Sequence, residues 1–357
     1  MARTLNRYFF RLMLSRFVLL FVALTIAALM LDMLAFADEI VEAGGNSTQA
    51  LLRYSLLRAP MIANKLVPFA ALLATLVVLT RMVRHSELTA IRASGFSQFQ
   101  LMLALLPAAF LIALPQFALD AWLAPKAVNE LRAWGVGDYG ESFGGTGDVT
   151  WLREGDNMVR IRHVNVEEGL LSGVTIIRRS GNGDFEDRVL AESAQYDGET
   201  WRLDEVTISD PRGNAPERRE SMIWETQIEP ETFSIFSEHP SEMSFFSLVR
   251  FLESPSFGNR PQYLYETWFH KRLAIPVTTV LIVLLCVPLV QRFERTARVT
   301  TMILAGVGLG FVYLSFDGVI LSIGEAGLLP AQLAAWVPTL ILMSVTGSIA
   351  FYYEYHR

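Results

Sequence analysis

The sequence predicts an α-helical membrane protein with six transmembrane helices and a β jelly-roll (β-sandwich) domain inserted between helices 3 and 4. First, the 357 residues are 52% hydrophobic and only 18% charged, whereas soluble domains carry about 25% charged residues. Second, the apolar residues gather in six long runs. Third, a polar segment with short alternating stretches separates the first three runs from the last three.

The composition and motifs exclude several classes of function. The net charge of −6 gives no general basic surface, so nucleic-acid binding is not expected. The single cysteine, Cys286, excludes a disulfide framework or a cysteine-based zinc site within the chain. The histidines show no ligand spacing, and neither a P-loop nor an HExxH motif is present. We therefore predict no metal, no cofactor and no catalytic activity of the chain itself.

The first apolar run follows a group of arginines and covers residues 15–37. From residue 17 onward its only charged residue is Asp32, and a helix of this length spans a bilayer at about 1.5 Å per residue. A cleaved signal peptide is the alternative, because AFA at the end of the run resembles a cleavage site. Signal peptides have a shorter apolar core, which favours an uncleaved first span.

Five further runs have the length of a membrane span. They cover residues 60–80, 99–123, 269–290, 300–323 and 333–353. Basic residues concentrate at the N-terminus and in the connections after the second and fourth spans, which share one side by parity. Because cytoplasmic connections are enriched in Lys and Arg, both termini are predicted to be cytoplasmic and the polar segment to lie on the outer side.

The polar segment, residues 126–265, contains short stretches of alternating apolar and polar residues, and it ends in an amphipathic helix. Short strands at such spacing are typical of a sandwich or jelly roll. The predicted interior of this β domain consists of Val159, Ile161, Val174, Ile176, Met222 and Trp224. Alternation is compatible both with a packed core and with a groove that holds a lipid.

A short charged stretch, RHSELTAIRASG, occupies residues 84–95 between the second and third spans. As a helix it places Leu88 and Ile91 on one stripe, and Gly95 fits a C-terminal stop. One reading is an interfacial helix whose charges are solvated. The other is a docking helix, whose apolar ridge and one exposed carboxylate, Glu87, fit a groove on a cytoplasmic partner.

Residues of special type inside the apolar runs have simple structural readings. GVGLG at residues 306–310 follows no strand, so close helix packing explains it better than nucleotide binding. Asp32 and Asp317 are costly in hydrocarbon, and such acids usually face a cavity or a partner. Both are expected near the outer ends of their spans, where solvation by interfacial water is the simpler reading for Asp32.

Several stretches resemble the LptF/LptG permease family, whose members extract lipopolysaccharide from the inner membrane. They are LNRYFFRLML, VPFAALLATLVVLTRMVRHSELTAIRASGFS, DAWLAPKA, WLREGDNMVRIRHV and GVGLGFVYLSFDGV, and they occur in the family's order, so that the resemblance extends along nearly the whole chain. WLREGDNMVRI and YLYETWFHKRLAIPV resemble the LptG branch more than the LptF branch.

The resemblance implies a domain organisation and partners. Residues 1–125 would form helices 1–3 with a cytoplasmic coupling helix at 84–95, residues 126–265 a periplasmic jelly roll with its amphipathic helix, and residues 266–357 helices 4–6. The chain would lie in the bacterial inner membrane as a heterodimer with an LptF-like permease. An LptB ATPase dimer would bind the coupling helix and hydrolyse ATP, LptC would be a further partner, and lipopolysaccharide would be the substrate.

The resemblance also implies three groups of site residues. The ATPase-coupling group is Arg84, Ser86, Glu87, Leu88, Ile91 and Arg92, with Glu87 at the position of the family's coupling glutamate. The substrate cavity or lateral gate is Leu24, Ala28, Leu31, Gly306, Gly310 and Phe311, for which packing or lipid contact is the alternative. The head-group rim is Arg132, Lys65, Arg58 and Lys126, of which Arg132 matches a basic family position. Lysines near the end of the family's first helix are replaced here by the acidic LDMLAFADEIVEAGG.

Other functions remain possible at this point. An LptF-type subunit of the same complex is one. A membrane-anchored sensor or interaction protein with a ligand-binding β domain is another, although it would rarely need six spans and an inner helix. A lipid-modifying membrane enzyme is disfavoured because no cluster of acid, base and nucleophile is present.

Overall fold

The structure of the protein is a computed structural model. It describes residues 2–44, 47–137, 150–154, 157–165, 169–179, 185–210, 215–226, 228, 239–253, 256–257, 260–294 and 299–355. The chain divides into two compact units. One comprises Met1–Gly140 with Glu266–Arg357, and the other comprises Glu141–Tyr265.

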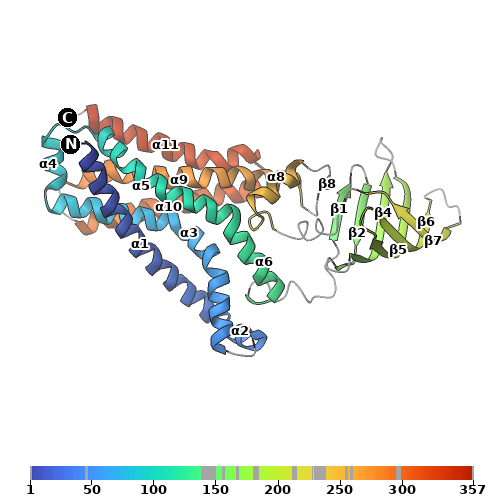
Figure 1. Ribbon diagram of the computed structural model, residues 1–357. Helices are drawn as coiled ribbons and strands as arrows, with labels where there is room; N and C mark the ends of the chain where they lie inside the picture. The colour runs from blue at the N-terminus through green and yellow to red at the C-terminus, as the bar shows by residue number, and fades with distance from the viewer. Residues whose placement is uncertain are drawn as a thin grey trace. The chain divides into compact units, whose positions relative to one another are not determined.

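The first unit is helical (Figure 1). Its elements are α1 (Ala2–Ala35), α2 (Ala37–Gly44), α3 (Ser47–Arg84), α4 (Glu87–Ala93), α5 (Gln98–Ala118), the π-helical turn η1 (Leu119–Leu123), α6 (Ala124–Trp134), α9 (Gln262–Glu294), α10 (Val299–Glu325) and α11 (Ala331–Tyr355). Within the described residues, six helical segments are long and apolar enough to cross a membrane. They contain the cores of the six predicted spans, so the predicted membrane part of the fold is confirmed.

The helices of this unit differ in how much of their surface the chain itself covers. In the most apolar stretch of each helix, 67% is buried for α3 and 61% for α9, but only 11% for α1 and 17% for α10. Leu76 and Leu79 of α3 lie with Val283 of α9 and Leu105 of α5 in one buried cluster. α3 and α9 are therefore the central helices, and α1 and α10 present apolar faces outward.

The connection between α3 and α5 differs from the predicted continuous helix over residues 84–95. α3 ends at Arg84, and Ser86 has a left-handed φ of 54°, which interrupts the right-handed helix before α4 begins. α4 then ends where the sequence predicted. Gly95 has a φ of 91°, and its N–H donates to the carbonyl of Arg92 at 3.0 Å.

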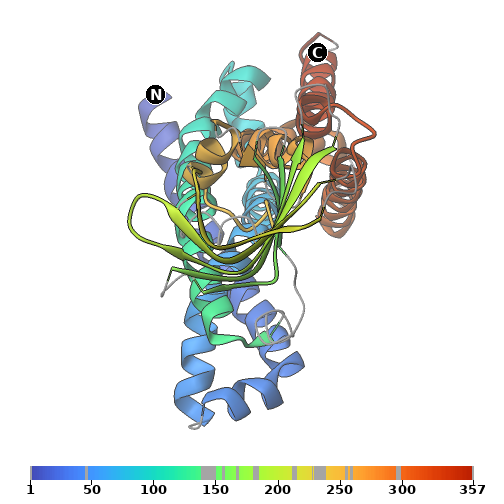
Figure 2. The same ribbon diagram turned by 90° about the vertical axis from the view of Figure 1, so that its right-hand side faces the viewer.

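The described residues of the second unit form an antiparallel sheet and one helix. Its elements are β1 (Thr150–Glu154), β2 (Asn157–Ile161), β3 (His163–Asn165), β4 (Leu170–Arg179), β5 (Phe185–Tyr196), β6 (Trp201–Ser209), β7 (Glu217–Trp224), α8 (Phe245–Glu253) and β8 (Ser256–Phe257). The strand order is β7-β6-β5-β4-β2-β1-β8, and β3 pairs with β4. The predicted antiparallel β domain is confirmed. Its described strands form one continuous, curved sheet rather than the two sheets of a sandwich (Figure 2).

One face of this sheet is buried. Among the predicted interior residues, Val159, Ile161, Val174, Ile176 and Trp224 are at most 6% exposed and Met222 is half-buried. The largest fully buried side chain of this face, Trp201, was not predicted. It is fully buried, and its Nε1 donates to the carbonyl of Ile228 at 2.7 Å. The face is thus packed around Trp201.

Candidate functional site

Among the described residues, three ion pairs connect different helices of the first unit inside its apolar spans. Their acids are Asp32 in α1, Asp120 in η1 and Asp317 in α10. Each acid lies in the second half of an odd-numbered span, and odd-numbered spans run in the same direction. The three pairs therefore lie towards the same end of the unit, away from the N-terminus and α4 (Figure 1).

The first pair joins α1 to α3. Arg58 donates from Nε to Asp32 Oδ2 at 3.1 Å and from Nη2 to Asp32 Oδ1 at 3.1 Å. The Tyr54 hydroxyl donates to Asp32 Oδ2 at 2.6 Å. The expectation that water solvates Asp32 was therefore wrong, because Arg58 neutralises its charge and Tyr54 donates a hydrogen bond to it. Arg58, with a side chain 8% exposed, is bound to this acid instead of facing a substrate.

The second pair joins α9 to the π-helical turn. Arg272 Nε lies 3.2 Å from Asp120 Oδ2, and Asn64 of α3 donates to Asp120 Oδ1 at 2.7 Å. The Arg272 side chain is 1% exposed. A π-helical turn inserts one residue into a helix and is frequent at functional sites. Here it carries the carboxylate that connects three helical segments.

The third pair joins α9 to α10. Lys271 Nζ donates to Asp317 Oδ1, and one turn earlier Trp268 Nε1 donates to Glu325 Oε1 at 2.8 Å. Asp317 is thus held by a cation from another helix. Lys271 and Arg272 are adjacent on α9 and project about 100° apart. Lys271 of α9 therefore pairs with α10, and Arg272 of α9 pairs with η1.

The remaining predicted rim cations lie on α3 and α6, which pack against each other. Lys65 is exposed, and Lys126 is exposed with its Nζ 4.4 Å from the centre of the Trp122 ring. Arg132 is half-buried and donates from Nη1 to Asn129 Oδ1 at 3.2 Å. Lys65 and Lys126 are the cations of this group that the chain leaves accessible.

The predicted gate residues divide into an exposed and a packed set. Leu31 of α1 and Phe311 of α10 are 71% and 68% exposed, while Leu24 and Ala28 are half-buried. Gly306 and Gly310 face α3, where an added Cβ would overlap the side chains of Leu76 and Leu72 respectively. These two glycines therefore bring α10 close to α3, which is the packing alternative, instead of lining a cavity.

At the opposite end of the unit, α4 is attached to α1 and to the core. The Tyr8 hydroxyl of α1 donates to Glu87 Oε2 at 2.8 Å. Leu88 is 1% exposed within the main core, and Ile91 packs against the same core. The apolar ridge of α4 therefore faces the protein's own helices, contrary to the prediction that it faces a partner.

The outward surface of α4 combines small and polar residues. Thr89, Ala90 and Ala93 of α4 are exposed, as are Arg84, His85 and Ser86 just before it, whereas Glu87 and Arg92 are half-buried. A partner that binds here would contact charges and hydroxyls, with the Glu87 carboxylate at the border between the surface and α1.

Sequence reasoning missed the partners in these contacts, namely Tyr8, Tyr54, Asn64, Asp120, Lys271 and Arg272. A signal was available for the charged ones. An acid inside an apolar span requires a cation from another span, because an unpaired charge in hydrocarbon is costly. Which cation pairs with which acid depends on helix packing.

The chain matches the protein family described as "Lipopolysaccharide export system permease LptF/LptG" over residues 7–353. It is 28% identical over 293 residues to the lipopolysaccharide export system permease protein LptG of Escherichia coli strain K12, covering 79% of this chain and 80% of that protein. It is 22% identical over 283 residues to the protein of the same name from Haemophilus influenzae, covering 77% of this chain and 78% of that protein.

Proposed function

Because the chain belongs to the LptF/LptG family of lipopolysaccharide export system permeases, we propose that it is the LptG-type permease subunit of an ABC transporter. In this role it extracts lipopolysaccharide from the inner membrane and passes it to a periplasmic bridge for export to the outer membrane. The family match over residues 7–353 carries the proposal, and the LptG relatives favour this subtype over an LptF-type subunit.

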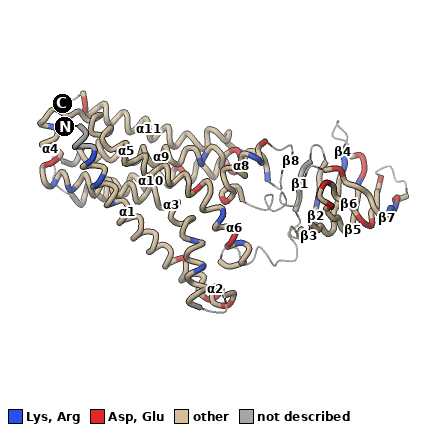
Figure 3. The backbone as a smooth tube through the Cα atoms, viewed as in Figure 1, with Lys and Arg blue, Asp and Glu red and all other residues tan. Residues whose placement is uncertain are grey.

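The proposed orientation places both termini and α4 in the cytoplasm and the β domain in the periplasm. Lys and Arg near the start of α1 and around the connection from α3 to α4 support it (Figure 3). With this orientation, the three intramembrane ion pairs lie in the outer half of the membrane. Lys65, Lys126 and Arg132 then lie on the side where the phosphates of lipid A would be bound.

The outward apolar faces of α1 and α10 support an LptF-like partner in the membrane. In an isolated chain, the exposed Leu31 and Phe311 on these faces would contact lipid. In a heterodimer they would border a cavity that takes the acyl chains of the substrate. LptC is the further proposed partner.

The exposed surface at α4, with Arg84, His85, Ser86 and Thr89 beside the Glu87 carboxylate, supports docking of an LptB-like ATPase dimer, which would hydrolyse the ATP. Glu87 would accept a charge-assisted hydrogen bond from the ATPase, and such bonds contribute about 1.5–3 kcal/mol. Because Glu87 also binds Tyr8, and Leu88 is held in the core, movement of α4 would pass to α1 and to the central helices.

The test is purification of the tagged chain from native membranes, followed by mass spectrometry and ATPase assays of the complex. We expect an LptB-like ATPase, an LptF-like permease and lipopolysaccharide. We also expect Glu87→Ala and Glu87→Arg to lower lipopolysaccharide-coupled ATPase activity by about tenfold or more. Asp38→Ala, which removes an exposed acid from α2, is the control. A chain that copurifies alone, or normal coupling in both Glu87 variants, contradicts the proposal.

A further inference from the structure

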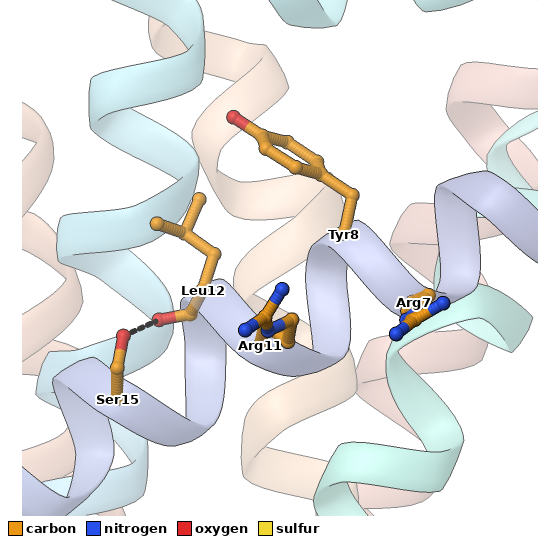
Figure 4. A pocket seen from close by; sticks show the side chains of 5 residues that line it. All are labelled: Arg7, Tyr8, Arg11, Leu12 and Ser15. Atoms are coloured by element: carbon orange, nitrogen blue, oxygen red, sulfur yellow. Dashed lines mark hydrogen bonds between the residues drawn. The ribbon is translucent and has the colours of Figure 1, made fainter.

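A cavity of about 530 Å³ opens beside the first turns of α1. Arg7, Tyr8, Arg11, Leu12 and Ser15 line it (Figure 4). Figure 4 shows the side chains of Tyr8 and Leu12 on one side of the helix. Those of Arg7 and Arg11 lie on another side, one turn apart. The proposed export function uses none of these side chains except Tyr8.

Within the described residues, the two arginines of the cavity have no acidic partner. Arg7 and Arg11 are exposed, and no carboxylate within the described part of the chain forms an ion pair with either. Glu87, which approaches this turn of α1, accepts its hydrogen bond from Tyr8. Like charges four residues apart on a helix repel each other. A bound anion would remove this repulsion, and guanidinium groups bind phosphate in a bidentate manner.

The same face of α1 continues as an apolar surface. At 100° per residue, eight positions from Arg7 to Ile26 fall within an arc of about 100°. They are Arg7, Tyr8, Arg11, Ser15, Val18, Val22, Thr25 and Ile26. Val18, Val22 and Ile26 are 50%, 47% and 53% exposed, and Thr25 is half-buried. The exposed side chains of this face are therefore cationic at the start of α1, hydroxyl-bearing at Ser15 and aliphatic from Val18 onward. They follow one another along the helix axis with a rise of about 1.5 Å per residue.

This order of side chains matches an amphiphile. A soluble anion would need only the two arginines, and an acidic peptide of a soluble partner would gain nothing from the aliphatic part. We propose that this face binds an anionic phospholipid of the cytoplasmic leaflet, with its phosphate between Arg7 and Arg11 and an acyl chain along Val18, Val22 and Ile26.

The bound lipid is distinct from the exported one. The proposed rim for lipopolysaccharide lies at the opposite end of the helical unit, on α3 and α6. The leaflet assigned to the phospholipid rests on the proposed orientation of the chain. The lipid would hold the start of α1 in place beside α4, because Tyr8 of the same turn binds Glu87.

The test is native mass spectrometry of the purified full-length chain, with any partners that copurify, titrated with phosphatidylglycerol or phosphatidylethanolamine of identical acyl chains. We expect stronger retention of phosphatidylglycerol. A basic residue at the membrane surface is worth about 1 kcal/mol towards an anionic lipid, which is about fivefold in affinity. Arg11→Gln should therefore lower phosphatidylglycerol retention about fivefold, and Arg7→Gln with Arg11→Gln should remove the preference.

The matched control is Arg16→Gln, because Arg16 lies on the same helix but on its opposite face. It should retain the preference. Val22→Ser should weaken retention of both lipids without changing their ratio. The same thermal stability in all variants shows that the fold is intact.

Equal retention of the two lipids by the unaltered chain would overturn the proposal, as would equal losses in Arg11→Gln and Arg16→Gln. Retention of glycerol 3-phosphate as strong as that of phosphatidylglycerol would show a site for a soluble anion instead. No transport or ATPase activity is measured, so a negative result here leaves the export proposal untouched.

Discussion

At the scale of single residues, three acids inside the spans are neutralised by cations from other helices. Asp32, Asp120 and Asp317 each meet a cation that is at most 8% exposed. Buried ion pairs add little net stability relative to apolar residues, but breaking one leaves an uncompensated charge. Such pairs therefore specify which helices lie side by side. α9 supplies two of the three cations, so it takes part in two of these three contacts.

Replacing Asp32 with Asn tests the pair at α1. Arg58 would remain buried without a counter-charge, so we expect the free energy of unfolding to fall by about 3 kcal/mol. The measurement is thermal or denaturant unfolding in detergent. Asp38→Asn, at an exposed position of α2, should leave stability unchanged. Equal stability of the two variants would show that Arg58 finds water or another acceptor.

At the scale of elements, α10 approaches α3 through glycines on one face only. An added Cβ at Gly306 would lie 2.8 Å from Leu76 Cδ2 and 3.2 Å from Leu76 Cγ, whereas one at Gly308 would have no neighbour within 4 Å. Rotation of Leu76 cannot relieve this overlap, because both of its methyl groups are close and the side chain is fully buried.

Gly306→Ala is therefore predicted to lower the free energy of unfolding by about 1–3 kcal/mol, the usual cost of overpacking. Gly308→Ala is the matched control on the same helix and should have no such effect. Thermal unfolding of both variants in the same detergent gives the comparison. A loss of stability in both, or in neither, would contradict the packing role of Gly306.

The element α4 is short but firmly attached. Seven residues would not form a stable helix alone. Its position depends on Leu88 in the core, on the hydrogen bond from Tyr8 and on the stop at Gly95. Such attachment suits an element that is proposed to transmit force from an ATPase.

At the scale of the whole molecule, the two units have separate cores. The helical unit is built around α3 and α9, and the β unit around Trp201. This division predicts that a core defect in one unit leaves the other folded.

Trp201→Ala should destabilise the β unit by about 3–5 kcal/mol, as expected for removal of a buried aromatic side chain. Hydrogen exchange with mass spectrometry is the measurement. Amides of β5, β6 and β7 should exchange faster, while those of α3 and α9 should keep the rates of the unaltered chain. Faster exchange in both units would show that they unfold as one.

The sequence alone determined the number of spans, the place of the β domain and the stop at Gly95. Long apolar runs must become helices that cross the membrane, because hydrocarbon offers no partner to backbone N–H and C=O groups. Local chemistry also identified the glycine, since few other residues adopt a left-handed φ at a helix end.

Alternation along the strands predicted part of the β interior but missed Trp201 and Leu203. In β6 the buried residues are Trp201, Leu203 and then Val206, so the period of two breaks near Glu205, which has a φ of 52°. When the inward-facing positions of a strand shift by one residue, a fixed period of two no longer predicts which residues are buried.

Only the tertiary structure decided which charges pair, which face of α4 points inward and why Gly306 is a glycine. Asp32 and Arg58 are separated by 26 residues, and Gly306 meets Leu76 from a different span. Each of these properties belongs to a contact between distant segments. Hydropathy and spacing describe one segment at a time, and a contact exists only when the packed helices bring two of them together.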